Sequence, residues 1–163
     1  MPDLRTSTDH VRLRYGFSGP AAGSGVTLSS ATTIAAARLQ ADKASATVPS
    51  RARPAVAEAL QLADGQIYSA SSVKGVAPTL HPLVEEILDA VPVADRGRAH
   101  GKCGLPQCIS EALTAGHNPT GSQAAAVTVR SSTTHAGHGQ PVGPCDSCVA
   151  LEDAFEIDFV TVR

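Results

Sequence analysis

The spacing of apolar residues changes along the chain and predicts short strands followed by helices. Residues 55–62 and 66–71 flank Asp64-Gly65, a dipeptide typical of tight turns, so the two segments together predict a β-hairpin. Residues 81–91 carry apolar side chains at intervals of three and four, which predicts an amphipathic helix.

The second half of the chain continues this alternation of elements. We predict helices over 105–115 and from Cys145 to about Phe155, and strands over 124–130 and 157–162. A polar loop over 131–143 contains His135 and His138, which we expect to be solvated rather than liganding. The order of elements predicts an α/β sandwich with helices on both faces of one sheet.

The first fifty residues have a different character. Residues 16–30 are rich in Gly, Ser, Thr and Ala, whereas residues 30–42 are good helix formers after a Ser/Thr start. We therefore expect residues 1–50 to form a loosely packed arm with one helix, the alternative being a disordered extension. Residues 51–163 would form the main domain.

Composition restricts the functions that are open to the chain. Its 163 residues are 42 % hydrophobic and 17 % charged with a net charge of −2, which is typical of a globular domain. No apolar run approaches the about 18 residues of a membrane span, and the N-terminus lacks the apolar core of a secretory signal. Aromatic residues make up 3 %, so the stacking surfaces that bind single-stranded nucleic acid are nearly absent. We expect a cytoplasmic protein that binds neither membranes nor nucleic acid.

The four cysteines gather between positions 103 and 148, a pattern that favours metal binding over disulfides in a reducing compartment. Cys145 and Cys148 lie one helical turn apart at a predicted helix start, where free backbone N–H groups stabilise thiolates. Cys103 lies at the start of another predicted helix. Three thiolates leave one corner of a tetrahedral Zn²⁺ site for water, which is the arrangement of a catalytic zinc rather than a structural one.

The fourth cysteine, Cys108, has three interpretations. A thiol on the inner face of a helix is commonly a small buried hydrophobe, but it could also be a fourth zinc ligand or a nucleophile paired with His100. As a ligand it would close the site, because Cys103-x4-Cys108 and Cys145-x2-Cys148 form an acceptable set for structural zinc.

Short motifs in a fixed order point to one family. They are Asp64-Gly65-Gln66-Ile67-Tyr68-Ser69, Lys74-Gly75, His81-Pro82-Leu83-Val84, His100-Gly101-Lys102-Cys103, Gly139-Gln140-Pro141 and Pro144-Cys145-Asp146-Ser147-Cys148. In this order and spacing they resemble the YwqJ-like branch of the cytidine deaminase superfamily over residues 54–160. The last motif is the Pro-Cys-x-x-Cys element of the zinc deaminases.

The resemblance implies a three-layer α/β/α sandwich with a mixed sheet, and Zn²⁺ held by Cys103, Cys145 and Cys148. Together with the composition, this leads us to expect a hydrolase whose substrate is a small nitrogen heterocycle or a related metabolite, and specialised metabolism suits a stand-alone chain. Deaminase-fold proteins are often dimers or tetramers, so a homo-oligomer stays open. The residues that would contribute to substrate binding are Ser69, Lys74, Gly75 and Pro144.

One position departs from the family. There His-Gly-x-Cys is followed by Ala-Glu, and the glutamate moves protons between the zinc-bound water and the leaving ammonia, whereas this chain has Gly104-Leu105. Leucine cannot transfer a proton, and general acid–base help is worth about 10²–10⁴ in rate. One replacement is Glu111 with Cys108 as its partner ligand, since residues three apart share a helix face. Another is His100, beside the metal loop.

Glu85 or Glu86 of the preceding helix could also supply a carboxylate. If Cys103 is the metal ligand, Glu111 is disfavoured as the proton carrier. The two residues are eight positions apart on a helix, a rise of about 12 Å that is beyond hydrogen-bond reach.

Three functions follow from these alternatives. The leading hypothesis is a zinc-dependent, deaminase-like hydrolase with an unusual proton carrier. The alternative is a catalytically inactive deaminase-fold module that binds a partner and keeps zinc for stability. A cysteine-nucleophile enzyme that uses Cys108 with His100 is the third.

Overall fold

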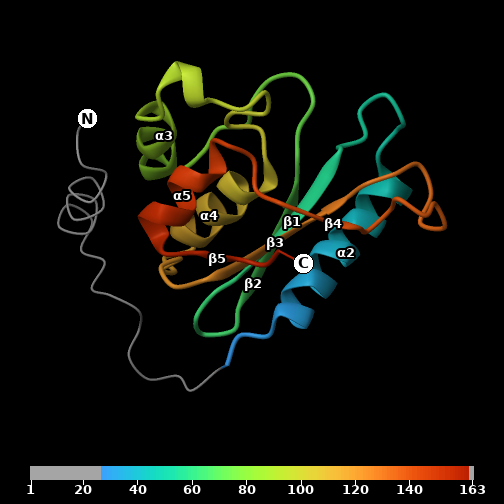
Figure 1. Ribbon diagram of the computed structural model, residues 1–163, viewed down its shortest axis with the longest axis horizontal. Coiled ribbons are helices and arrows are strands. Elements are labelled where there is room, and N and C mark those ends of the chain that lie inside the picture. Colours follow the sequence, from blue (N-terminus) through green and yellow to red (C-terminus); the bar gives the residue numbers. More distant parts are fainter. Residues whose placement is uncertain (1–26, 162–163) are drawn as a thin grey trace.

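The computed structural model describes residues 27–161, which form one mixed sheet with helices on both faces (Figure 1). The strands of this part of the chain are β1 (Val56–Gln61), β2 (Ile67–Ser71), β3 (Gln123–Thr128), β4 (Pro141–Val142) and β5 (Asp158–Phe159). The helices are α2 (Ser30–Thr47), α3 (Pro82–Asp89), α4 (Gly104–Thr114) and α5 (Cys148–Phe155), with a 3-10 turn η1 (Val93–Asp95). One layer holds α2 and the other holds α3, α4 and α5, so the three-layer α/β/α sandwich is confirmed.

The sheet is built outward from the β1–β2 hairpin. β1 lies between β2 and β3 and is antiparallel to both. Gly65 in the hairpin turn has a φ of 92°, a left-handed conformation that side chains disfavour. The Asp64 carboxylate accepts a hydrogen bond from the backbone N–H of Gln66 over 2.9 Å, which completes the predicted turn.

Two short strands share the outer edge of β3. β4 is antiparallel and pairs with Ala126 and Val127, whereas β5 is parallel and pairs with Gln123 and Ala124. The parallel pair makes the sheet mixed. β5 is shorter than the strand predicted over 157–162, whose last residue lies outside the described part of the chain.

Helix α2 packs directly on the sheet, and the side chains between them are small. The buried residues are Ala37, Ala41, Ala44, Ala57, Ala59, Ala125, Val127 and Val129. Small side chains let the helix approach the strands closely, which suits a chain with few aromatic residues. The predicted helix thus extends to Thr47 and forms an outer layer of the fold, where we expected a loosely packed arm. Residues 1–26 of that arm lie outside the described residues.

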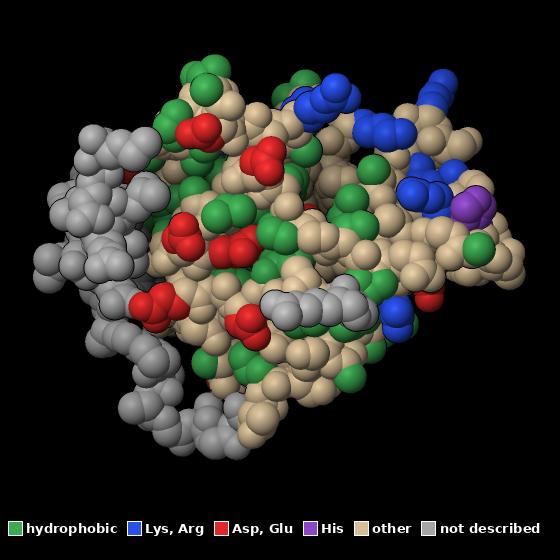
Figure 2. Space-filling view, in the orientation of Figure 1, with side chains coloured by type: hydrophobic (Ala, Val, Ile, Leu, Met, Phe, Trp, Pro, Cys, Tyr) green, Lys and Arg blue, Asp and Glu red, His purple; other side chains and the backbone are tan. Residues whose placement is uncertain are grey.

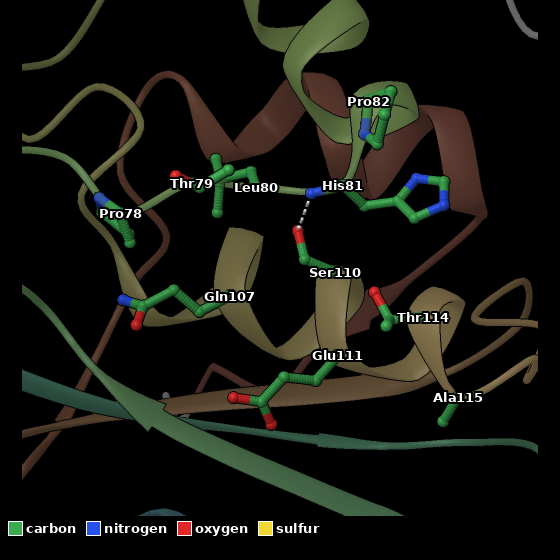
Figure 3. A pocket seen from close by; sticks show the side chains of 10 residues that line it. All are labelled: Pro78, Thr79, Leu80, His81, Pro82, Gln107, Ser110, Glu111, Thr114 and Ala115. Carbon is green, nitrogen blue, oxygen red and sulfur yellow. Dashed lines mark hydrogen bonds between the residues drawn. The ribbon is translucent and has the colours of Figure 1, made fainter.

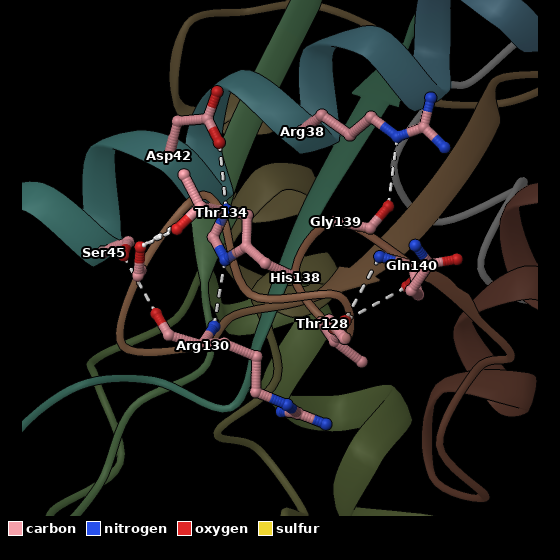
Figure 4. Close-up of polar contacts among 11 residues, drawn as sticks. Arg38, Asp42, Ser45, Thr128, Arg130, Thr134, His138, Gly139 and Gln140 are labelled. Carbon is pink, nitrogen blue, oxygen red and sulfur yellow. Dashed lines mark hydrogen bonds and ion pairs between the residues drawn. The ribbon is translucent and has the colours of Figure 1, made fainter.

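Helix α2 also holds the 130–140 loop, which leads into β4 (Figure 4). Arg38 Nε donates to the carbonyl of Gly139 over 3.0 Å, and Ser45 Oγ donates to the carbonyl of Arg130 over 2.9 Å. These bonds join residues that are 101 and 85 positions apart in the sequence, so the loop is fixed to the far layer of the sandwich.

His138 completes this attachment. Its Nε2 lies 2.9 Å from Asp42 Oδ1, and its Nδ1 accepts the backbone N–H of Arg130 over 3.0 Å. The side chain is only 4 % exposed, so the expectation that His138 is solvated is wrong. His135 is exposed, as expected.

The opposite face of the sheet carries the larger apolar side chains. Its fully buried members include Leu60, Leu62, Leu83, Leu105, Ile109, Leu151 and Phe155. Because side chains alternate along a strand, Leu60 of β1 faces α4 whereas Ala57 and Ala59 face α2. The same alternation directs Glu58 toward α4.

Charges are unevenly distributed over the surface. In Figure 2, acidic side chains gather over α3 and α5, and basic side chains lie toward the opposite end of the view. The net charge of −2 is a sum over both regions and does not reveal this separation. Because the two regions differ in charge, the electrostatic attraction of a charged ligand depends on the end that it approaches. Within residues 27–161, no helix has both the length and the apolar character needed to cross a bilayer.

Enlarging a side chain between α2 and the sheet should destabilise the fold. Ala41 is completely buried, so Ala41→Leu should lower the free energy of unfolding by about 1–3 kcal/mol, measured by urea unfolding with circular dichroism. The control is Leu39→Ala on the same helix, whose side chain is 70 % exposed and whose effect should stay within about 0.5 kcal/mol. Equal stability of Ala41→Leu and wild type would show that α2 does not pack on the sheet.

Candidate metal centre

A tight turn places Cys103 at the start of α4. The backbone N–H of Lys102 donates to the carbonyl of Ala99 over 2.7 Å, and Gly101 has a φ of 74°, which favours glycine. Cys103 is the N-cap residue of α4. It therefore lies at the helix end where backbone N–H groups lack partners within the helix.

The other two cysteines come from the turn before α5. The backbone N–H of Cys148 donates to the carbonyl of Cys145 over 2.9 Å and closes this turn. The helix therefore begins at Cys148, three residues later than the start that we predicted. The Pro-Cys-x-x-Cys element is a turn followed by a helix start.

The sulfurs of these three cysteines converge. Cys145 Sγ lies 3.0 Å from Cys103 Sγ and 2.9 Å from Cys148 Sγ, and all three atoms lie within 4.8 Å of one another. All three are free thiols, with Cys103 and Cys148 buried and Cys145 partly exposed. Among residues 27–161 they are the group of His, Cys, Asp and Glu side chains that could hold a metal ion. Three soft thiolate donors fit a tetrahedral Zn²⁺ ion and leave its fourth coordination position without a protein ligand.

The thiol protons are shared unevenly within the cluster. Hydrogen bonds with Cys103 and Cys148 lower the pKa of Cys145 to about 3. The hydrogen bond with Cys145 raises the pKa of Cys103, and hydrogen bonds with both neighbours raise the pKa of Cys148. Metal ligands must be thiolates, so a divalent ion at this site would displace thiol protons.

Ser147 links the two metal-binding segments. Its Oγ accepts the backbone N–H of Gly97 over 3.0 Å and lies 2.8 Å from His100 Nδ1. Ser147 is 1 % exposed, so this bridge between the Cys103 loop and the Cys145 turn is internal. Burial, followed by the charge of Arg96, lowers the pKa of His100. His100 therefore lies near the cysteines, but its Nδ1 is engaged with Ser147, and its predicted catalytic role stays a prediction.

Cys108 lies apart from the cluster. Cys108 lies on the inner face of α4 and is completely buried, and its Sγ lies 4.0 Å from the backbone carbonyl oxygen of Glu58. Burial raises its pKa well above the usual value for a thiol. In the described residues Cys108 is thus a small core residue, and the closed four-sulfur site does not form.

A buried carboxylate that the hydrophobic pattern did not reveal lies next to the cysteines. Glu58 of β1 is 5 % exposed, and its Oε2 accepts the backbone N–H of Leu105, two residues beyond Cys103. Burial raises the pKa of Glu58 to about 8, although the hydrogen bond from Leu105 acts in the opposite direction. A sequence signal was present, because Glu58 is the charged residue on the strand face that also carries Leu60 and Leu62.

Gly104 allows this contact between α4 and the sheet. A Cβ atom at Gly104 would lie 2.7 Å from the carbonyl oxygen of Ala70 and 3.0 Å from Glu58 Cβ. The first distance is too short for any side chain, and the carbonyl belongs to the backbone of β2 and cannot turn away. The first turn of α4 therefore rests directly on the strands.

Glu111 lies in a different place from the cysteines. It lines a cavity of about 660 Å³ between the 78–82 segment and the outer side of α4 (Figure 3). Ser110 Oγ accepts the backbone N–H of His81 beside this cavity over 3.0 Å. The structure brings Glu111 near Cys108 but not into the group of metal-binding side chains, and its predicted catalytic role stays a prediction.

The predicted substrate-binding residues are dispersed. Ser69 Oγ donates to Gln40 Oε1 of α2 over 3.3 Å, so its side chain lies on the sheet face opposite the cysteines. Lys74 and Gly75 are exposed in the loop after β2, and Pro144 directly precedes Cys145. Their predicted contribution to substrate binding stays a prediction.

A three-layer α/β/α sandwich with three cysteines that could hold a metal ion is consistent with a deaminase-like zinc fold. The chain belongs to the YwqJ-like deaminase family, whose model matches residues 40–157. This match confirms the resemblance seen in the sequence, and it includes Glu58 and the three clustered cysteines. Comparison with curated proteins and with solved structures gives no match.

Removing a converging cysteine should remove the metal, whereas removing Cys108 should not. We expect one zinc per chain in wild type and in Cys108→Ala, measured by elemental analysis after gel filtration. Cys103→Ala should lose zinc, with a fall in affinity beyond the about 10–100-fold typical of changes outside the ligand shell. Retention of zinc by Cys103→Ala, or its loss from Cys108→Ala, would contradict the three-sulfur site.

The raised pKa of Glu58 makes the stability of the metal-free protein depend on pH. Between the ordinary glutamate pKa of 4.5 and the folded value of about 8, the folded chain keeps a proton that the unfolded chain loses. This carboxyl therefore destabilises the fold as pH rises, by up to about 1.4 kcal/mol per pH unit. Glu58→Gln, which cannot ionise, should be increasingly more stable than wild type across this range. Unfolding curves in the presence of a chelator measure the difference, and a constant difference would contradict the assignment.

Proposed function

We propose that the protein is a zinc-dependent hydrolase that releases ammonia from a small nitrogen heterocycle or a related amidine-like metabolite. The observation that carries the proposal is the convergence of Cys103, Cys145 and Cys148 without a fourth protein ligand in the described residues. A closed structural site would use four ligands, whereas a catalytic site keeps one position for solvent.

The chemistry follows from this donor set. Zn²⁺ held by the three thiolates would lower the pKa of water and supply a nucleophile near neutral pH. Ser147 fixes the Cys103 loop to the Cys145 turn, so the ligands are oriented before the ion binds. Leu105 is buried among apolar side chains and cannot carry a proton, so the reaction needs an acid–base group from another element.

A small substrate fits the composition better than a nucleic acid. The chain has two Tyr, three Phe and no Trp, which leaves few surfaces for stacking bases. We propose a role in specialised metabolism in the cytoplasm, with a homo-oligomer as an open alternative to a monomer.

The leucine at position 105 also motivates a second function. In this alternative the fold is a binding module without catalysis, and zinc serves only its stability. Such a module would bind one zinc per chain but would release no ammonia from any substrate.

Ammonia release distinguishes the two functions. Zinc-loaded wild type is incubated with cytidine-like and guanine-like compounds, and ammonia is measured by a coupled assay. We expect release that a chelator abolishes and that added zinc restores, with Cys103→Ala as the inactive control. A fully zinc-loaded wild type that leaves every compound intact would support the binding module and overturn the hydrolase.

A further inference from the structure

We infer that Glu58 carries the proton that Leu105 cannot, so that the acid–base group of this site comes from strand β1 instead of helix α4. The inference rests on the proposed hydrolase function. It assigns a catalytic residue that lies 45 positions before Cys103 in the sequence.

The position of the carboxylate is set by the β1 strand. Side-chain alternation directs Glu58 to the same face as Leu60, which packs beneath α4. Its Oε2 accepts the backbone N–H of Leu105, two residues beyond Cys103. The carboxylate thus reaches the first turn of α4 from the sheet side, beside a residue that cannot transfer a proton.

The chain is adapted to this approach at a second position. A methyl group at Gly104 would overlap the carbonyl of Ala70 and crowd Glu58 Cβ, at 2.7 and 3.0 Å. No side chain fits at this position. The glycine at position 104 therefore lets the first turn of α4 rest on the strand that carries the buried Glu58.

Glu58 is suited to proton transfer rather than to ligation. Within the described residues, the side chains that converge closely enough to hold an ion are the three cysteines, and the Glu58 carboxylate is outside this group. It nevertheless contacts the two residues that follow Cys103, because its Oε2 accepts the backbone N–H of Leu105 and its Cβ lies 3.0 Å from where a Cβ of Gly104 would be. A carboxylate just beyond the ligand shell is where an acid–base group for the open corner must lie.

Other acid–base candidates are less well placed. Glu111 lines the cavity on the far side of α4, and His100 has its Nδ1 engaged with Ser147. Glu152 follows Cys148 by one helical turn and is half-buried, with Oε1 lacking a hydrogen-bond partner. A half-buried carboxylate on the helix that begins at Cys148 is therefore the matched comparison.

The proposed step balances without an oxidant or reductant. A water proton passes to the Glu58 carboxylate as the water oxygen bonds to the amidine-type carbon of the substrate. As this bond forms, the C=N electron pair moves to the ring nitrogen. Glu58 then delivers a proton to the exocyclic nitrogen, the C=N bond re-forms as the bond to that nitrogen breaks, and ammonia leaves. The remaining hydroxyl proton passes to the ring nitrogen to give the carbonyl. The sum is substrate plus water giving a carbonyl product plus ammonia, with Glu58 returned to its initial state.

A purely structural role predicts a different response to substitution. A carboxylate at a helix N-terminus commonly caps the helix, and an amide oxygen accepts the same hydrogen bond. Glu58→Gln therefore keeps the cap on Leu105 and removes only the proton carrier. Glu58→Ala removes both.

The test compares Glu58→Gln, Glu152→Gln and wild type, each loaded with zinc and assayed for ammonia release. We expect Glu58→Gln to keep one zinc per chain and to lose at least about 10²-fold in rate. Glu152→Gln should stay within a few-fold of wild type. Full activity of Glu58→Gln, or a larger loss in Glu152→Gln, would overturn the assignment.

A second readout does not depend on turnover. With Co²⁺ in place of zinc, the sulfur-to-metal charge-transfer band reports the thiolates, and the visible ligand-field bands report the fourth corner. We expect Glu58→Gln to leave the charge-transfer band unchanged and to shift the ligand-field bands. If Glu58 served only as the helix cap, both kinds of band would stay unchanged. This comparison judges Glu58 even if wild type releases no ammonia, a result that would overturn the hydrolase function itself.

Exchange of the two residues gives the converse test. Glu58→Ala combined with Leu105→Glu returns the carboxylate to helix α4, and we expect at least about tenfold more ammonia release than from Glu58→Ala alone. Zinc content and thermal unfolding of both variants show whether they are folded. A folded, zinc-loaded double variant with no recovery would contradict the inference.

Discussion

The contact between the first turn of α4 and the β1–β2 pair determines the rest of the candidate site. Gly104 rests on the Ala70 carbonyl with no space for a side chain, and this fixes the depth at which Cys103 emerges. The same contact brings the Leu105 backbone N–H to Glu58. A position defined by backbone against backbone cannot relax by a change of rotamer, so the backbones that carry Cys103 and Glu58 are held at a constant separation.

The second set of ligands reaches this point by another route. Cys145 and Cys148 follow the short strand β4, whose pairing with β3 returns the chain to the sheet. The hydroxyl of Ser147 then joins their turn to the Cys103 loop. The metal-binding segments are thus fixed to each other and to the sheet, and metal binding needs little rearrangement of the backbone.

Local sequence signals predicted the secondary-structure elements and the three candidate metal-binding cysteines. They did not predict contacts between residues far apart in the sequence. Asp64-Gly65 specifies its turn through residues next to it, and the Cys145–Cys148 spacing specifies the turn that leads into α5. Glu58 lies beside Leu105 only in the folded chain, because the two residues are 47 positions apart in the sequence. The packing of α2 was hidden for a related reason, because alanine is too small and too common to mark a buried helix face.

Helix α2 ties the two outer layers of the molecule together. Its Arg38 and Ser45 donate hydrogen bonds to backbone carbonyls near the two ends of the 130–140 loop. That loop continues through β4 to Cys145. A change on the alanine-rich layer can therefore be transmitted along the chain to the sulfurs on the other side of the sheet. Metal affinity would then depend on residues that never approach the ion, and a polypeptide trimmed to the family match at residue 40 would lose the Arg38 anchor.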